Sequence, residues 1–242
     1  MKKLLAALTV ALLATVSIGA HAKDWTTIRF GVDASYPPFE SKGPDGKLVG
    51  FDIDLGNEIC TRLKAKKFDG VLSSMSMTPQ RAEQIAFSSK LFNTPTRLVA
   101  KKGSGILPTA ESLKGKTVGV EQGTIQETYA KTYWEAKGAK VVPYQNQDQV
   151  YADLLSGRLD AALQDAVQAE IGFLKTPRGA GFDFVGKNLD DPKILGNGAG
   201  IGMRKEDTDL KTKVDKAIAD IIKDGTYKKL EKKYFDFDVY GS

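Results

Sequence analysis

The stretch TVGVEQGTIQETYAKTYWEAKGAKVVPYQNQDQVYADLLSGRLDAALQD, residues 117–165, alternates between short apolar runs and longer amphipathic segments. The short runs are typical of buried strands and cover residues 117–120, 141–144 and 159–163. The segments between them predict helices at about 125–137 and 148–156, each followed by a glycine, Gly138 or Gly157, in the usual helix-ending position. A β-α-β-α-β order requires a parallel sheet with right-handed crossovers, so the stretch places the chain in the α/β class.

The earlier part of the chain follows a similar plan. Residues 27–32 predict a first strand, and a short hairpin ends near Val49. Apolar residues at every fourth position predict a helix over residues 51–67, and a strand is expected at residues 68–73. The tail is expected to be helical over residues 209–234, with a break at its single internal glycine. Two α/β lobes that face each other form a cleft, which is a common place for a small-molecule site.

The two lobes differ in length, although residues 63–69 and 154–160 align as helix ends that lead into a strand. In the second lobe, two helices and one strand precede this junction, whereas in the first lobe only one helix and a hairpin do. We therefore expect the first lobe to lack about one βα unit. We also expect the lost strand to be an interior one, which would leave backbone groups of its neighbours unpaired.

The start of the chain predicts a secretory signal peptide over residues 1–22. Lys2 and Lys3 precede a long apolar run, and Ala20, His21 and Ala22 form a small-x-small cleavage signal. Cleavage after Ala22 leaves 220 of the 242 residues and predicts an exported protein. The leader has no acids, so 33 basic and 30 acidic residues remain, and a formal charge of +3 gives no reason to expect a nucleic-acid partner.

The scarcity of histidine and cysteine excludes several classes of protein. The only histidine, His21, leaves with the signal peptide, so the mature chain has no imidazole for a catalytic triad or a zinc site. Cys60 is the only cysteine, so no intramolecular disulfide can form. The sequence therefore predicts a protein that is not an enzyme and that has no catalytic residue, no metal and no cofactor.

The segment VLSSMSMTPQR, residues 71–81, predicts a binding site. Ser73, Ser74 and Ser76 follow a strand at the sheet edge where α/β proteins bind ligands. A capped helix start then places Arg81 in the first helical turn. Hydroxyl groups and a guanidinium suit a carboxylate, although a plain capped helix with a surface arginine would show the same pattern.

Further candidates lie at equivalent places in both lobes. Thr124 and Ile125 begin a helix of the second lobe, whose amides suit an anion. Asp33 and Tyr36 follow the first strand, and Asp165 follows the strand at residues 159–163. Anion-binding groups on both lobes, together with two carboxylates for cations, predict a ligand with a carboxylate, an ammonium and a second positive group. A basic amino acid meets that description.

At this point the chain resembles the periplasmic solute-binding proteins for polar amino acids that serve ABC importers, above all the members that bind lysine, arginine, ornithine or histidine. The resemblance covers nearly the whole mature chain and includes the sequences YPPF at 36–39, GFDIDL at 50–55, SSMS at 73–76, LDAA at 159–162 and KKYF at 232–235. It implies a type II periplasmic-binding-protein fold with two lobes, each a parallel-rich sheet flanked by helices. Relatives usually have one further βα unit between Arg62 and Leu63, which in several of them carries a second cysteine.

The resemblance also implies a role for each candidate residue. Arg81 and Ser76 would hold the ligand α-carboxylate, and Ser74 and Asp165 its α-ammonium. The other roles are distal-cation binding by Asp33 and Ser73, side-chain packing by Tyr36, and completion of the carboxylate cradle by Thr124 and Ile125. Many relatives have a hydroxyl side chain where this chain has Ile125, so its backbone amide alone would contribute.

The implied organisation and partners complete the set of expectations. Lobe 1 would comprise residues 23–92 and 200–242, lobe 2 residues 96–196, and the hinges residues 93–95 and 197–199. A monomer would deliver the amino acid to an inner-membrane ABC permease. The alternatives are an exported enzyme on the same fold, similar to a cyclohexadienyl dehydratase, and a truncated variant with impaired binding. For the enzyme, Glu121, Glu127 and Asp165 are the available acids, but no recognisable acid–base pair links them.

Overall fold

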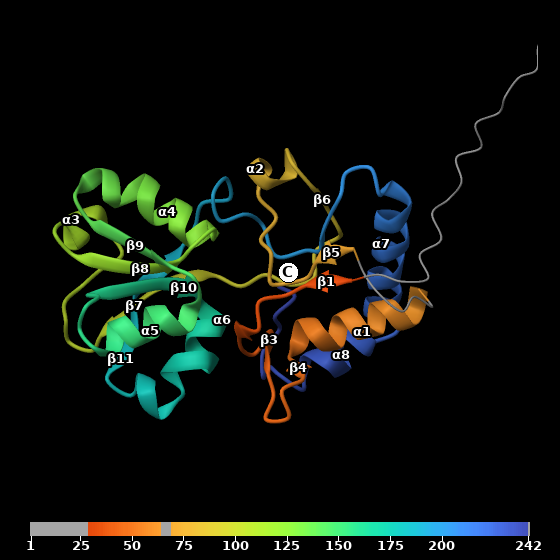
Figure 1. The fold of residues 1–242 in the computed structure, drawn as a ribbon, viewed down its shortest axis with the longest axis horizontal. Helices are drawn as coiled ribbons and strands as arrows, with labels where there is room; N and C mark the ends of the chain where they lie inside the picture. Colours follow the sequence, from red (N-terminus) through yellow and green to blue (C-terminus); the bar gives the residue numbers. More distant parts are fainter. Residues whose placement is uncertain (1–28, 64–68, 242) are drawn as a thin grey trace, which may run out of the picture.

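The computed structural model describes residues 29–63 and 69–241. The predicted signal peptide with its cleavage site after Ala22, and the expected helix end at Lys67, lie outside these residues. Two α/β lobes stand side by side, with lobe 2 at the left of Figure 1 and lobe 1 at the right. The predicted α/β class and the two-lobed architecture are thus confirmed. No helix in the described ranges is long and apolar enough to cross a membrane.

Lobe 2 contains one five-stranded sheet in the order β11-β7-β10-β8-β9. Its strands are β7 (Thr96–Lys101), β8 (Thr117–Glu121), β9 (Lys140–Tyr144), β10 (Ala161–Asp165) and β11 (Phe182–Leu189). The predicted parallel arrangement is confirmed for β9, β8 and β10. On the other side of β10, β7 pairs with it in antiparallel fashion, and β11 in turn pairs antiparallel with β7.

Helices cover both faces of this sheet. They are α3 (Ala110–Leu113), α4 (Ile125–Tyr133), α5 (Gln147–Leu155) and α6 (Ala166–Ala169), with short helical turns at Glu135–Lys137, Glu170–Leu174 and Pro177–Gly179. One core lies on the α4 face around Leu163 and Trp134, and a second lies on the α5 face around Ala162 and Tyr151. Gly138 ends the turn after α4 with a φ of 97°, as the sequence predicts.

Lobe 1 contains a four-stranded sheet in the order β1-β5-β12-β6 and a separate small sheet, β2-β3-β4. The strands are β1 (Phe30–Gly31), β2 (Ser35–Tyr36), β3 (Glu40–Lys42), β4 (Leu48–Val49), β5 (Gly70–Val71), β6 (Ala86–Phe87) and β12 (Gly202–Met203). The helices are α1 (Phe51–Leu63), α2 (Pro79–Ala82), α7 (Thr208–Lys223) and α8 (Thr226–Glu231). The helical tail and its break at Gly225 agree with the prediction.

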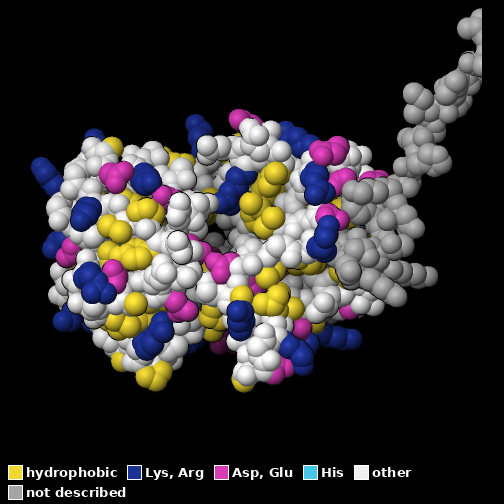
Figure 2. All heavy atoms as spheres, in the orientation of Figure 1, with side chains coloured by type: hydrophobic (Ala, Val, Ile, Leu, Met, Phe, Trp, Pro, Cys, Tyr) yellow, Lys and Arg dark blue, Asp and Glu magenta, His cyan; other side chains and the backbone are white. Residues whose placement is uncertain are grey.

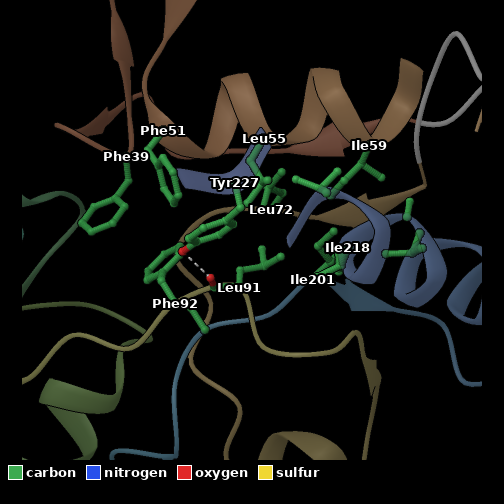
Figure 3. Close-up of a cluster of buried hydrophobic side chains, with 14 of the residues drawn as sticks. Phe39, Phe51, Leu55, Ile59, Leu72, Leu91, Phe92, Ile201, Ile218 and Tyr227 are labelled. Carbon is green, nitrogen blue, oxygen red and sulfur yellow. Dashed lines mark hydrogen bonds between the residues drawn. The ribbon is translucent and has the colours of Figure 1, made fainter. Parts of the chain in front are cut away.

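The core of lobe 1 lies between the sheet and helices α1, α7 and α8. Figure 3 shows Leu55 and Ile59 of α1 pointing toward Leu72, Ile201 and Ile218. Aromatic rings close the end nearest lobe 2, where the Phe39 and Phe92 rings stack with centroids 4.8 Å apart. The hydroxyl of Tyr227 donates a 2.7 Å hydrogen bond to the carbonyl of Leu91, so this polar atom is satisfied inside the core.

The two sheets share one plan, which corrects the expectation of a lost interior strand. Strands β1, β5, β12 and β6 occupy the places of β8, β10, β7 and β11, with the same parallel and antiparallel pairings. Only β9, an edge strand, has no counterpart among the described strands of lobe 1. The second strand of a β-α-β-α-β unit lies outside the first, so its loss shortens the sheet without opening a gap inside it.

The shorter lobe also has one sheet face with little cover. In the shared plan, Leu72 corresponds to Leu163 and Val71 to Ala162. Ala162 is fully buried against the α5 side of lobe 2, whereas Val71 is 38% exposed and lines an open hollow with Met75 and Ile85. Lobe 1 therefore lacks a counterpart of α5 on this face among its described helices, while the core on the α1 face is in place.

Adjacent residues on the two faces provide a test of this asymmetry. We expect Leu72→Ala to lower the free energy of unfolding by about 2–5 kcal/mol, because Leu72 is 2% exposed within the core. We expect Val71→Ala to lower it by less than about 1 kcal/mol, because half-exposed side chains lose little contact. Urea unfolding of the two variants measures both values. Equal destabilisation would show that the Val71 face is covered.

Candidate functional site

The carboxyl ends of the two sheets face each other across a cavity of about 230 Å³ between the lobes. Figure 2 shows a hollow at this position, with acidic and basic side chains beside it. Eight of the nine predicted site residues line the cavity: Tyr36, Ser73, Ser74, Ser76, Arg81, Thr124, Ile125 and Asp165. The ninth, Asp33, lies next to this lining, because its backbone amide donates a 3.0 Å hydrogen bond to the hydroxyl of Ser73.

Arg81 connects the two lobes through neutral partners. Its backbone amide is held by the Thr78 hydroxyl at the start of α2. Its guanidinium donates 3.1 Å hydrogen bonds to the carbonyl of Ser76 in lobe 1 and to the carbonyl of Gly123 in lobe 2. Within residues 29–63 and 69–241 no carboxylate forms an ion pair with it, and burial lowers the pKa of this guanidinium. A carboxylate ligand would supply the missing negative charge.

The start of α4 presents backbone amides close to Arg81. The Thr124 hydroxyl accepts a hydrogen bond from the Glu127 amide, and the Glu127 carboxylate accepts one from the Gly123 amide at 2.6 Å. This reciprocal cap fixes the first turn of the helix. It does not use the amides of Thr124 and Ile125, so the side chain at position 125 is not required for an anion to bind there.

Asp165 lies on the opposite side of the cavity at the end of β10. One carboxylate oxygen caps α6 by accepting 2.9 Å hydrogen bonds from the amides of Val167 and Gln168, and the other accepts one from the Thr94 hydroxyl. Burial raises the pKa of Asp165 to about 6, against the effect of these hydrogen bonds. At neutral pH the group remains mostly ionised, and its oxygens retain lone pairs for an ammonium.

Tyr36 closes the cavity from the side of lobe 1. Its hydroxyl donates a 3.2 Å hydrogen bond to the side chain of Gln164, so the contact crosses from one lobe to the other. Burial, together with the nearby charges of Asp165 and Glu121, raises the pKa of this phenol well above its usual value. The phenol of Tyr36 therefore stays neutral close to the acidic groups of Asp165 and Glu121.

Glu121 is the main site residue that the sequence analysis did not assign to the binding site. It ends β8, is 9% exposed and lines the cavity. Burial and the adjacent charge of Asp33 raise the pKa of Glu121 to about 8. The signal was present in the sequence, because Glu121 follows Val120 of the second lobe as Asp33 follows Val32 of the first. The other lining residues that were not predicted include Met75, Asn93, Thr94, Thr96, Gln126 and Leu195.

Residues 28–67 and 59–237 match the pattern of the bacterial extracellular solute-binding proteins, family 3. The chain belongs to this family. The two matched segments overlap at residues 59–67, as expected where this solute-binding protein lacks residues that the family pattern contains.

Individual relatives agree with this assignment. The solute-binding protein is 49% identical to the lysine/arginine/ornithine-binding periplasmic protein and to the histidine-binding periplasmic protein of Escherichia coli K12, and the alignments cover both partners completely. Each alignment spans 259 positions against 242 residues here, so at least 17 positions are gaps in this chain. An ancestral arginine-binding protein bound to arginine has a similar structure, with a TM-score of 0.80 and 34% identity, and the match covers 89% of this chain and 100% of that one. The predicted type II fold is confirmed.

Two buried acids of this solute-binding protein, Glu40 and Asp52, hold Ser73 and Ser74 of the cavity lining in place. Glu40 and Asp52 are 1% and 0% exposed. The Ser73 hydroxyl donates a 2.6 Å hydrogen bond to Glu40, and the Ser74 amide donates a 2.8 Å hydrogen bond to Asp52. Burial and the Asp52 charge raise the pKa of Glu40 far above its usual value, so the pair shares a proton at neutral pH.

Raised carboxyl pKa values determine the sign of the pH dependence of stability. When folding raises the pKa of an acid, the folded state binds more protons than the unfolded state, and the free energy of unfolding falls as pH rises. This applies to Glu40 and also to Asp52, whose pKa burial raises to about 6. We expect the ligand-free protein to be more stable at pH 5 than at pH 8 by urea unfolding.

Two substitutions at Glu40 distinguish the contribution of its proton to stability from the contribution of its hydrogen bonds and packing. Glu40→Gln replaces a protonated carboxyl with an amide of similar shape, so we expect it to keep stability at pH 7 within about 1 kcal/mol and to weaken the pH dependence. Glu40→Ala removes the partner of Ser73 and leaves Asp52 without its shared proton, so we expect a loss of about 2–4 kcal/mol. If both substitutions destabilise equally, the pair does not share a proton.

Proposed function

We propose that this protein is a periplasmic binding protein that captures a basic L-amino acid, namely arginine, lysine, ornithine or histidine, between its lobes and delivers it to an ABC importer of the inner membrane. The observation that carries the proposal is the separation of charge in the cavity, where Arg81 lacks a carboxylate partner and Asp33 and Asp165 lie apart from it. A molecule with one carboxylate and two cationic groups complements this pattern.

The ligand lies with its backbone atoms between the two lobes. Its α-carboxylate binds the guanidinium of Arg81 and the amides that begin α4, and replaces the carbonyls that now hold the guanidinium. Its α-ammonium binds Asp165 and the Ser74 hydroxyl. The side chain packs on Tyr36, and its distal cation reaches Asp33 beside Ser73. Each role matches the charge and position of the group that performs it.

Two adjacent crossovers serve as the hinge between the lobes, at residues 93–95 and 197–199. Phe92, just before the first segment, forms an antiparallel bridge with Ala199, the last residue of the second. The Ala199 amide donates a 2.8 Å hydrogen bond to the Phe92 carbonyl. Gly198 has a φ of 111°, and a Cβ there would lie 2.7 Å from the Phe92 carbonyl oxygen, so only glycine fits. Rotation about these segments closes the lobes on the ligand, and the importer recognises the closed form.

Binding without catalysis accounts for the site better than the enzyme alternative. The relatives at 49% identity are named as binding proteins. Two of the three acids considered for catalysis have other partners in the structure, since Glu127 caps α4 and pairs with Lys131 while Asp165 caps α6. The shortened lobe 1 keeps every predicted site residue, so we expect binding despite the missing unit.

A panel of amino acids tests the proposed function. We expect arginine, lysine, ornithine or histidine to raise the melting temperature of the mature chain, because a ligand that binds only the folded state stabilises it. The neutral and acidic amino acids serve as controls in the same thermal melts. If a cooperatively folded sample responds to none of the basic amino acids, the proposal fails.

Arg81 provides the matching mutational test. We expect Arg81→Ala to weaken binding of the preferred amino acid at least about 30-fold by calorimetry, because the ligand carboxylate loses its charged partner. Arg81→Lys keeps the charge without the two-pronged geometry and should bind with intermediate affinity. Arg178→Ala removes an exposed arginine of lobe 2 and is the control, with unchanged affinity expected. Unchanged affinity in Arg81→Ala would place the carboxylate elsewhere.

A further inference from the structure

Glu121 lines the cavity and has a buried carboxyl oxygen for which the described residues supply no hydrogen-bond donor. The residue is 9% exposed, and the oxygen concerned is Oε2. A buried oxygen of this kind is unfavourable unless a ligand or a proton satisfies it. The backbone carbonyl of Glu121, by contrast, accepts a 2.7 Å hydrogen bond from the Thr124 hydroxyl, so the end of β8 is fixed.

Another carboxyl stands beside Glu121. Asp33 of lobe 1 is close enough for its charge to raise the pKa of Glu121, and its backbone amide donates a 3.0 Å hydrogen bond to the hydroxyl of Ser73, which lines the cavity. The Asp33 carboxylate is itself fixed, because one of its oxygens accepts hydrogen bonds of 2.9 Å and 2.7 Å from the amide and hydroxyl of Ser35. Two carboxyl groups, one from each lobe, are thus held close together at the cavity, with Glu121 in its lining and Asp33 next to the lining residue Ser73.

We propose that Glu121 and Asp33 together form a two-carboxylate clamp for the distal group of the ligand, and that the clamp selects a guanidinium, the side-chain end of arginine. This inference rests on the proposed function and specifies its ligand. A guanidinium is planar and carries five donors on more than one edge, so it can hydrogen-bond to two carboxylates on opposite sides. A lysine or ornithine ammonium is a point charge, and an imidazole has only two ring nitrogens.

The clamp also couples binding to the release of a proton. In the free protein Glu121 holds a proton at neutral pH, since its pKa is raised to about 8 by burial and by the adjacent Asp33. A guanidinium between the carboxyls favours the ionised form of both, so the proton leaves to solvent. The affinity for arginine therefore rises with pH between about 6 and 8. The other titratable groups around Glu121 are Tyr36, Arg81 and Asp165 in the cavity, Tyr144 on β9 and Tyr151 on α5.

Citrulline distinguishes the clamp from the rest of the site. It has the shape of arginine but a neutral urea group, so both ligands share every contact except the charged one. Calorimetry at pH 7 with arginine and citrulline should show a strong preference of the wild-type protein for arginine. In Glu121→Gln we expect this preference to fall by roughly tenfold or more, because one charge-assisted contact becomes neutral. Affinity for citrulline should change little.

Matched variants and a proton count complete the experiment. Asp33→Asn should reduce the same preference, and the double variant should lose less than the two single effects combined. Glu135→Gln, an exposed acid of lobe 2, is the control. Calorimetry in buffers of different ionisation enthalpy should show close to one proton released per arginine by the wild type and far less by Glu121→Gln. Urea unfolding establishes that each variant is folded.

The outcomes separate this inference from the function on which it rests. If arginine binds and Glu121→Gln keeps both the full preference over citrulline and the proton release, the clamp is wrong and the proposed function stands. If histidine or lysine binds more tightly than arginine, the guanidinium assignment is wrong while the class of ligand stands. If no basic amino acid binds to the folded wild type, both proposals fail.

Discussion

The partly buried guanidinium of Arg81 is held by two backbone carbonyls, one from each lobe, and no carboxylate among the described residues forms an ion pair with it. Carbonyl dipoles satisfy its donors but do not neutralise its charge. The acids at the cavity are Glu121 and Asp165 in its lining and Asp33 next to it, and none of them forms an ion pair with Arg81. The contact between the lobes is therefore electrostatically incomplete, and a ligand with separated charges completes it.

This division of charge follows from a duplicated plan. Each lobe contributes a parallel strand pair, and in each lobe an acid stands at or just beyond the end of the first strand, Asp33 after β1 and Glu121 as the last residue of β8. In the neighbouring strand the register makes Ser74, three residues after β5, equivalent to Asp165, the last residue of β10. Because the carboxyl ends of both sheets face each other, side chains at equivalent positions meet across one cavity.

The same plan explains how lobe 1 keeps its site without a complete sheet. The missing strand corresponds to β9, at the sheet edge, and the missing helix covers a face away from the core around Leu72 and Ile201. Strands β1 and β5, which carry the site residues, remain paired with each other. Ser73 and Ser74 are also held by hydrogen bonds to Glu40 and Asp52. These two acids belong to β3 and α1, which are present, and not to the missing unit.

The sequence by itself determined the α/β class, the two lobes, the shortened first lobe and eight residues of the cavity lining, because hydrophobic periods and strand-end positions are local properties. It placed Ser73 and Asp165 after strands at the sheet edge where ligands bind, and Arg81 in the first turn of a helix beside them. Only the tertiary structure decided which groups share that space. Glu121 stood in the sequence as one acid among many, and its meeting with Asp33 depends on the packing of two lobes that the chain connects through distant crossovers. Likewise, the edge position of the lost strand follows from sheet order, which is set by long-range pairing.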